Sequence, residues 1–216
     1  MNRRARIATA ALVVSTALLL TACGSGGGSD SSQGKIKGAD AADEKSSAGP
    51  SASAAQDGVK RPEITLPKEF QADFEGWTNS DAKLQAIMND GREELRAKYA
   101  AIIEANPDSE AVAFYNSDAT LSTAQKWIKQ FTDDGDSIIG EVKAFDPQVH
   151  INDTGSGVLF YCVDERQAST KNRRTGKIVK TPDKPASLIQ YRVRLDKTSQ
   201  GVWKTTSLTT VPGGCS

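Results

Sequence analysis

The sequence lacks an excess of either charge and, after residue 23, lacks any long hydrophobic run. It contains 27 basic and 27 acidic side chains in 216 residues. Without Arg3, Arg4 and Arg6, which lie in the N-terminal leader, 24 basic residues face 27 acidic ones. A nucleic-acid partner calls for a basic patch, and a membrane-spanning helix needs about 20 apolar residues. We therefore expect neither nucleic-acid binding nor a transmembrane helix in the mature chain.

Residues suited to catalysis or metal binding are also scarce. His150 is the one histidine, so it is the one available imidazole base if Cys162 were a nucleophile. The acidic run at Asp133, Asp134 and Asp136 lacks the alternating oxygen ligands and terminal glutamate of a calcium loop, and we interpret it as a solvated turn. We expect no metal, no cofactor and no enzymatic activity.

The N-terminus has the pattern of an export signal. A basic start, residues 2–6, precedes an apolar stretch, residues 7–20, that is too short to span a bilayer. The run Leu20-Thr21-Ala22-Cys23 resembles the lipobox of bacterial lipoproteins. The resemblance implies cleavage before Cys23, acylation of its thiol with palmitate-type chains, and residence on the outer face of the cytoplasmic membrane. Arg3-Arg4 leaves the export route open between the general and the twin-arginine pathway.

Composition then divides the rest of the chain. Residues 23–62 are rich in Gly, Ser, Ala and Asp and cannot bury enough apolar surface to offset chain entropy. We interpret them as the lipidated cysteine followed by a disordered tether with a reach of roughly 30–37 Å. Residues 63–216 have the length of one ordinary domain.

Two cysteines remain in this domain, Cys162 and Cys215. In an oxidising, extracytoplasmic setting an even pair most simply forms a disulfide. Closing this loop would stabilise the fold by about 4 kcal/mol in the chain-entropy model. A nucleophilic Cys162 is the alternative.

Hydrophobic periodicity predicts helices first and strands afterwards. Helical spacing predicts a long helix over residues 80–105 capped by Asn79 or Ser80, a short one over 109–115, and a third that starts at Ser117 or Asp118 and ends before 133. Alternating residues predict strands over 138–145, 148–152, 157–164, 189–195 and 202–210, with a hairpin tip or mobile loop at 171–177. This order predicts an α+β domain with N-terminal helices packed on a curved antiparallel sheet.

Several short runs resemble one family. They are Ala124–Ile128, Ile138–Val142, Phe160–Asp164, Thr175–Val179 and Gly201–Lys204, with the terminal Cys215. Together they are similar to secreted actinobacterial lipoproteins whose folded part is a nuclear-transport-factor-like cone, a fold shared with polyketide cyclases and ketosteroid isomerases. The resemblance implies a cavity between sheet and helices, and it also implies pairing of Cys162 with Cys215.

In enzymes of this fold the cavity holds a base and an oxyanion donor. Asp164 or His150 could supply the base here, and Tyr161 or Tyr191 the donor, but strand position favours solvent exposure for Asp164 and His150. The aromatic residues are expected in the core or at the cavity; the candidate lining residues are Trp127, Phe131, Tyr161, Tyr191 and Trp203.

The expected function is a non-catalytic module that binds a small apolar ligand or an envelope protein. One alternative is an accessory subunit of an envelope transport or cell-wall machine, and a further one is a cone-fold isomerase or cyclase. Arg173, Arg174, Lys171 and Lys177 could touch lipid phosphates or teichoic acids, although a solvated loop tip is the simpler interpretation.

Overall fold

A computed structural model describes residues 58–215. The export signal, Cys23 and most of the expected tether lie outside the described residues. The elements, in chain order, are β1 Phe70–Phe74, α1 Ala82–Glu104, α2 Glu110–Tyr115, α3 Asp118–Thr132, β2 Asp136–Ile151, β3 Gly157–Asp164, β4 Ala168–Asn172, β5 Ile178–Lys180, the 3-10 turn Pro185–Ser187, β6 Leu188–Lys197 and β7 Trp203–Pro212. None of the helices in this part of the chain is long and apolar enough to cross a membrane.

The three helices lie where periodicity predicts them, with one correction at the start of α1. Neither Asn79 nor Ser80 is the N-cap. Asp81 takes this position, and its carboxylate accepts hydrogen bonds from the backbone N–H groups of Lys83 and Leu84. A carboxylate there satisfies two of the N–H groups that a helix start leaves without intrahelical partners.

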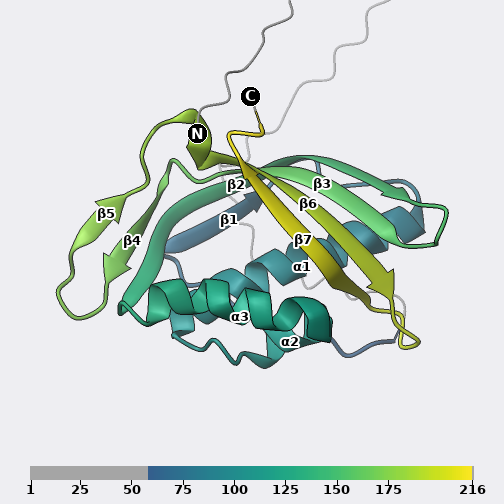
Figure 1. The fold of residues 1–216 in the computed structure, drawn as a ribbon, viewed down its shortest axis with the longest axis horizontal. Coiled ribbons are helices and arrows are strands. Elements are labelled where there is room, and N and C mark those ends of the chain that lie inside the picture. The colour runs from purple at the N-terminus through teal and green to yellow at the C-terminus, as the bar shows by residue number, and fades with distance from the viewer. Residues whose placement is uncertain (1–57, 216) are drawn as a thin grey trace, which may run out of the picture. The chain divides into compact units, whose positions relative to one another are not determined.

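The strands form one sheet around β2. Gly140 pairs with both Phe70 of β1 and Ala168 of β4, so those two strands lie on opposite edges of β2. Asp164 at the end of β3 pairs with Lys143, on the same edge as β4. Strands β3 and β4 therefore continue one another, with a bend at residues 165–167. Strands β6 and β7 extend the sheet beyond β3, and β5 extends it beyond β4 (Figure 1).

Strand β1 was not predicted, and it makes the sheet mixed rather than wholly antiparallel. Its five residues run parallel to residues 140–144 of β2. A parallel partner needs a long crossover connection, which here contains all three helices. The alternation within five residues is too short to reveal such a partner about 70 positions away in the sequence.

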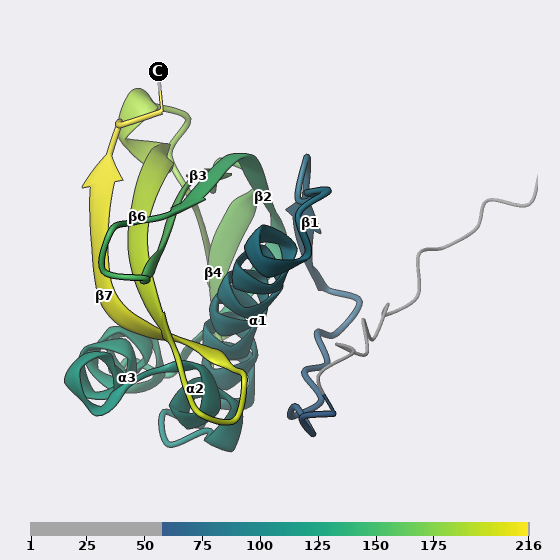
Figure 2. The same ribbon diagram turned by 90° about the vertical axis from the view of Figure 1, so that its right-hand side faces the viewer.

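The helices cover one face of the curved sheet, as Figure 2 shows, so the predicted α+β cone is confirmed. Alternation along β3 fixes the two faces: Leu159, Tyr161 and Val163 are buried against the helices, while Val158 and Phe160 point the other way and stay partly exposed.

Gly91 in the middle of α1 allows the helix and the sheet to approach closely. A Cβ atom at this position would lie 2.6 Å from a methyl group of Leu159, well inside contact distance. The glycine weakens the helix by about 1 kcal/mol relative to alanine, and the close packing of α1 on β3 offsets that cost.

The chain before β1 lies along α1. Ile64 is buried and Val59 and Leu66 pack against the core. The Arg61 guanidinium binds the Asp90 carboxylate at 2.9 Å, and Arg96 donates to the carbonyl of Ile64. The contacts of the folded part thus begin at Val59, four residues before the expected start at Glu63.

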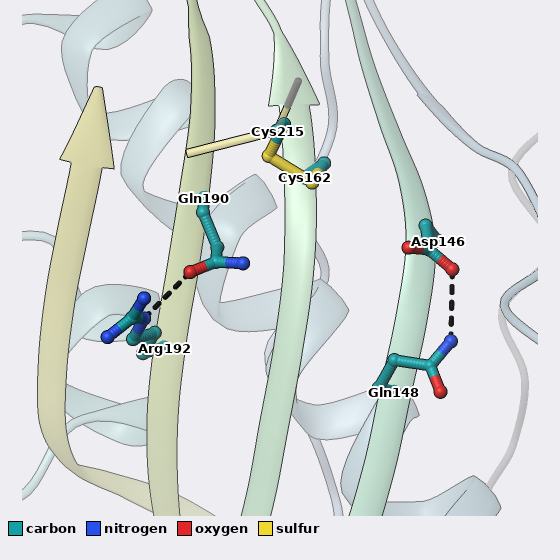
Figure 3. The surroundings of a disulfide bond; sticks show 6 residues. All are labelled: Asp146, Gln148, Cys162, Gln190, Arg192 and Cys215. Atoms are coloured by element: carbon teal, nitrogen blue, oxygen red, sulfur yellow. Dashed lines mark hydrogen bonds between the residues drawn. A yellow bond between two sulfur atoms is a disulfide. The ribbon is translucent and has the colours of Figure 1, made fainter. Parts of the chain in front are cut away.

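Cys162 and Cys215 form a disulfide, as predicted, with Cα atoms 5.9 Å apart. Figure 3 shows the bond on the sheet face turned away from the helices, above Gln190 and Arg192 of β6. It attaches the last residues of the described chain to the centre of the sheet.

Candidate functional site

A small cavity lies between the helices and the sheet at the bend of β3 and β4. Its volume is about 70 Å³, room for about two water molecules. Helices α1 and α3 supply one side, and β1, β2 and β4 the other. Its lining consists of Phe70, Tyr99, Ile102, Trp127, Phe131, Ile138, Val142, Glu165, Ala168, Ser169, Thr170 and Thr181.

Two of the five aromatic residues expected at the cavity, Trp127 and Phe131, line it. Their rings meet edge to face 5.4 Å apart on consecutive turns of α3. Tyr161 and Tyr191 do not line it, because they stack on each other, 4.9 Å apart, deeper between α1 and the sheet. Trp203 lies at another part of the core, where its backbone N–H donates to Asp90.

Glu165 is the acidic residue that the structure brings to the cavity. It occupies the bend between β3 and β4 and is half-buried; burial, assisted by the neighbouring charge of Asp164, raises the pKa of its carboxyl. Glu165 was not among the predicted site residues, whereas its neighbour Asp164 was. The signal was present, since Leu159, Tyr161, Val163 and Glu165 continue one alternating series toward the helices.

Three buried phenols lie in this part of the core, and the charge of Glu165 acts on two of them, Tyr99 and Tyr191. Burial raises the pKa of Tyr99, Tyr161 and Tyr191 above the usual value, and the charges of Glu165 and Glu94 raise those of Tyr99 and Tyr191 further. Within the described chain the hydroxyl groups of Tyr99 and Tyr161 have no hydrogen-bond partner. These phenols stay protonated at neutral pH and can donate to an acceptor.

A buried ion pair borders the aromatic residues. The Lys98 ammonium lies 3.0 Å from the Glu94 carboxylate, and Asn116 donates to the same carboxylate. The ammonium also lies 5.7 Å from the ring centre of Trp127 and 5.9 Å from that of Tyr191. A cation this close to aromatic faces is attracted by their negative quadrupole. Lys98 therefore already interacts with Glu94 and with two aromatic rings.

The two bases considered from the sequence lie elsewhere. Asp164 accepts two hydrogen bonds from the Arg166 side chain, and this contact holds its pKa below the usual value. His150 is exposed on the part of β2 that pairs with β3 alone, and it stacks on Phe160. Neither residue lines the cavity.

Metal binding finds no support in the described residues 58–215, where no group of three or more His, Cys, Asp or Glu side chains could hold an ion. Within the acidic turn, Asp136 accepts a hydrogen bond from Asn172, and the Asp134 carbonyl accepts another. These contacts attach the turn to β4.

Comparison with known proteins gives structural likeness alone. The chain matches no family model and no curated protein. Among solved structures, the intermembrane-space region of the chloroplast protein ARC6 is 10% identical, with a TM-score of 0.44, and covers 62% of this chain and 99% of its own. A ketosteroid isomerase-like protein from Erwinia carotovora is 14% identical, with a TM-score of 0.43; the match covers 59% of this chain and 94% of that protein.

A third solved structure, Aln2 from a Streptomyces species, is 11% identical, with a TM-score of 0.40, and covers 57% of this chain and 88% of its own. These structures are similar in fold at low identity. The fold assignment of this chain follows from its own helices and sheet.

Proposed function

We propose that this protein is a lipid-anchored, extracytoplasmic binding module without catalytic activity, and that the cavity beside Glu165 is its binding site. The observation that carries the proposal is the pairing of aromatic walls with buried polar groups that lack protein partners. The Tyr99 hydroxyl has no partner in the described chain. Burial raises the pKa of the Glu165 carboxyl, and no cation in that part of the chain counteracts this shift.

Such a site favours a small occupant with an apolar body and a hydrogen-bonding group. Trp127, Phe131 and Phe70 supply apolar surface, and the protonated Tyr99 phenol can donate to a carbonyl or ether oxygen. A volume of about 70 Å³ excludes a drug-sized molecule unless the α3 side chains move. A partner protein could fill the same space with one apolar side chain.

A non-catalytic role is favoured over an isomerase or cyclase by the positions of the ionisable groups. General acid–base catalysis needs an acid and a base that both reach the substrate. Glu165 is the one carboxyl that lines the cavity, and Lys98, whose ammonium lies 5.7 Å from the ring centre of the lining residue Trp127, is already bound to Glu94. The remaining polar lining consists of hydroxyl groups, which bind and orient a ligand.

Native mass spectrometry of the detergent-extracted full chain from its host tests the binding role. We expect a bound small molecule at one per chain. Ala168→Leu, which adds a side chain to the cavity wall, should abolish this binding. Ala119→Leu, on the exposed side of α3, should leave it intact. Equal binding by Ala168→Leu would exclude the cavity. A protein partner in place of a ligand would favour the accessory-subunit role, and turnover of a bound molecule would contradict the non-catalytic one.

The anchor is tested separately. Growth with radiolabelled palmitate should label the mature protein, and Cys23→Ala should abolish the label and release the protein from the membrane fraction or block its processing. An unlabelled mature chain would refute the lipid anchor and leave the cavity untouched.

A further inference from the structure

The β4–β5 hairpin carries apolar side chains that nothing in the fold covers. Ile178 and Val179 are 52% and 53% exposed, and no other large apolar side chain in the described chain is exposed to this degree. Because Ile178 pairs with Lys171 and Val179 with Thr170, the two point to opposite faces of the hairpin. Figure 1 shows the hairpin projecting at one end of the sheet.

The same hairpin is basic along its whole length. Residues 168–182 contain Lys171, Arg173, Arg174, Lys177 and Lys180 and no acidic residue. All residues from 173 to 180 are exposed. Arg174, Lys177 and Lys180 form no ion pair with any side chain of the described chain.

The hairpin is held in place at the start of its turn, where Asn172 ends β4 and Arg173 follows. Arg173 donates to the carbonyl groups of Ile102 and Ile103 at the end of α1, at 2.6 and 3.0 Å. Asn172 binds the acidic turn before β2. The backbone N–H of Arg173 also donates to the Gly135 carbonyl, so this turn lies beside the start of the hairpin loop, whereas Lys180 on β5 is two strand spacings, roughly 10 Å, away from β2. That distance is about one Debye length at physiological salt.

We propose that this hairpin is a docking element for an anionic lipid surface. Ile178 and Val179 enter the boundary between headgroups and acyl chains, while Arg174, Lys177 and Lys180 bind lipid phosphates. Entry is shallow, since the unpaired backbone groups on the outer edge of β5 need water or headgroups as partners. The inference rests on the proposed anchor in one respect, that the anchor keeps the domain close to a bilayer.

A lipid surface fits the hairpin better than another strand does. An exposed edge strand can pair with a second copy of the chain, but lysines on the edge disfavour such pairing. Here Lys177 and Lys180 flank the two apolar residues. Apolar side chains on both faces of a narrow ribbon suit a medium that surrounds the ribbon, whereas a flat partner would cover one face.

Vesicle flotation of a chain that begins at Gly24 tests the proposal without the acyl anchor, and this chain keeps every residue of the core. We expect it to bind vesicles of phosphatidylglycerol and phosphatidylcholine, with binding that weakens as salt is raised. Vesicles of phosphatidylcholine alone should bind it far more weakly.

Two variants separate the contribution of the basic side chains to vesicle binding from that of the apolar side chains. Lys177→Gln with Lys180→Gln should weaken binding to the anionic vesicles roughly 20- to 30-fold. Ile178→Ser with Val179→Ser should leave weak, fully salt-sensitive binding. The matched control is Lys126→Gln with Lys129→Gln, which removes two exposed charges from α3 and should bind as the unmodified chain does.

Equal binding to both vesicle types, binding to neither, or unchanged binding of the hairpin variants would overturn the proposal. A dimer in solution that Ile178→Ser with Val179→Ser disrupts would assign the hairpin to strand pairing instead. Failure of palmitate labelling at Cys23 would refute the anchor without changing any of these results.

Discussion

The inner face of α1 buries polar groups at two places, and the two places treat them differently. Toward the start of the helix, Asp90 binds both Arg61 and the backbone N–H of Trp203, and Glu94 binds Lys98 and Asn116. Farther along, the Tyr99 hydroxyl has no partner within the described chain, and it lies beside Glu165 at the cavity.

This difference separates polar groups that hold the fold together from polar groups that the proposed binding site could offer to a ligand. Buried polar groups that satisfy one another fix the position of α1 on the sheet and leave nothing to offer a ligand. A buried hydroxyl without a protein partner costs about 1–3 kcal/mol, a cost that an acceptor bound at the cavity would remove. The two places should therefore respond differently to mutation.

The largest effect is expected at Asp90. Asp90→Ala should destabilise the fold by about 3–5 kcal/mol, because it leaves the Trp203 N–H without its acceptor and removes the carboxylate from the Arg61 guanidinium. Urea unfolding measures the loss. Asp153→Ala, in an exposed turn, is the control and should stay within about 0.5 kcal/mol of the unmodified protein. A loss below about 1 kcal/mol at Asp90 would mean that this pair does not hold α1.

The next effect concerns Glu94 and Lys98. Glu94→Gln or Lys98→Met alone should lower the free energy of unfolding by about 3 kcal/mol, because each leaves one buried charge without its partner. The double variant should cost less than the two losses added together. A double-mutant cycle by urea unfolding gives the coupling, and additive losses would show that the two charges do not depend on each other.

A pH-dependent effect is expected at Glu165. Because burial raises its pKa in the folded state, the folded protein binds more protons than the unfolded chain, and stability falls as pH rises from about 4.5 through the folded-state pKa. Glu165→Gln should remove this fall and stabilise the protein at neutral pH, with no gain below pH 4.5. Unfolding curves across this range test it, with the exposed Glu141→Gln as control. Parallel curves for both variants would contradict a desolvated Glu165.

The smallest effect is expected from the phenols. Tyr99→Phe and Tyr161→Phe each remove a hydroxyl that lacks a partner, so stability should increase by about 1 kcal/mol, the lower end of the cost of such a hydroxyl. Thermal unfolding, followed by circular dichroism, measures it. A loss above about 2 kcal/mol at either position would reveal a structural hydrogen bond and weaken the contrast.

Local patterns were sufficient for most of the fold. The spacing of Leu95, Tyr99 and Ile102 predicted α1, and the alternation around Tyr161 predicted β3. The cavity was harder to predict: Trp127 and Phe131 were anticipated at its wall, Glu165 was missed, and Trp203 was expected there but lies beside Asp90. Strand alternation gives the direction of a side chain and leaves open which helix covers it.

By itself, the sequence determined the three helices, the longer strands and the capacity for a disulfide, since periodicity and an even pair of cysteines act over short stretches or through chemistry alone. Only the tertiary structure decided that Asp90, Glu94 and Lys98 are buried and that Glu165 meets an aromatic cavity. Each of these outcomes depends on partners far away in the chain, among them Arg61, Asn116 and Trp127. Burial of a charge is favourable only after such partners have come together.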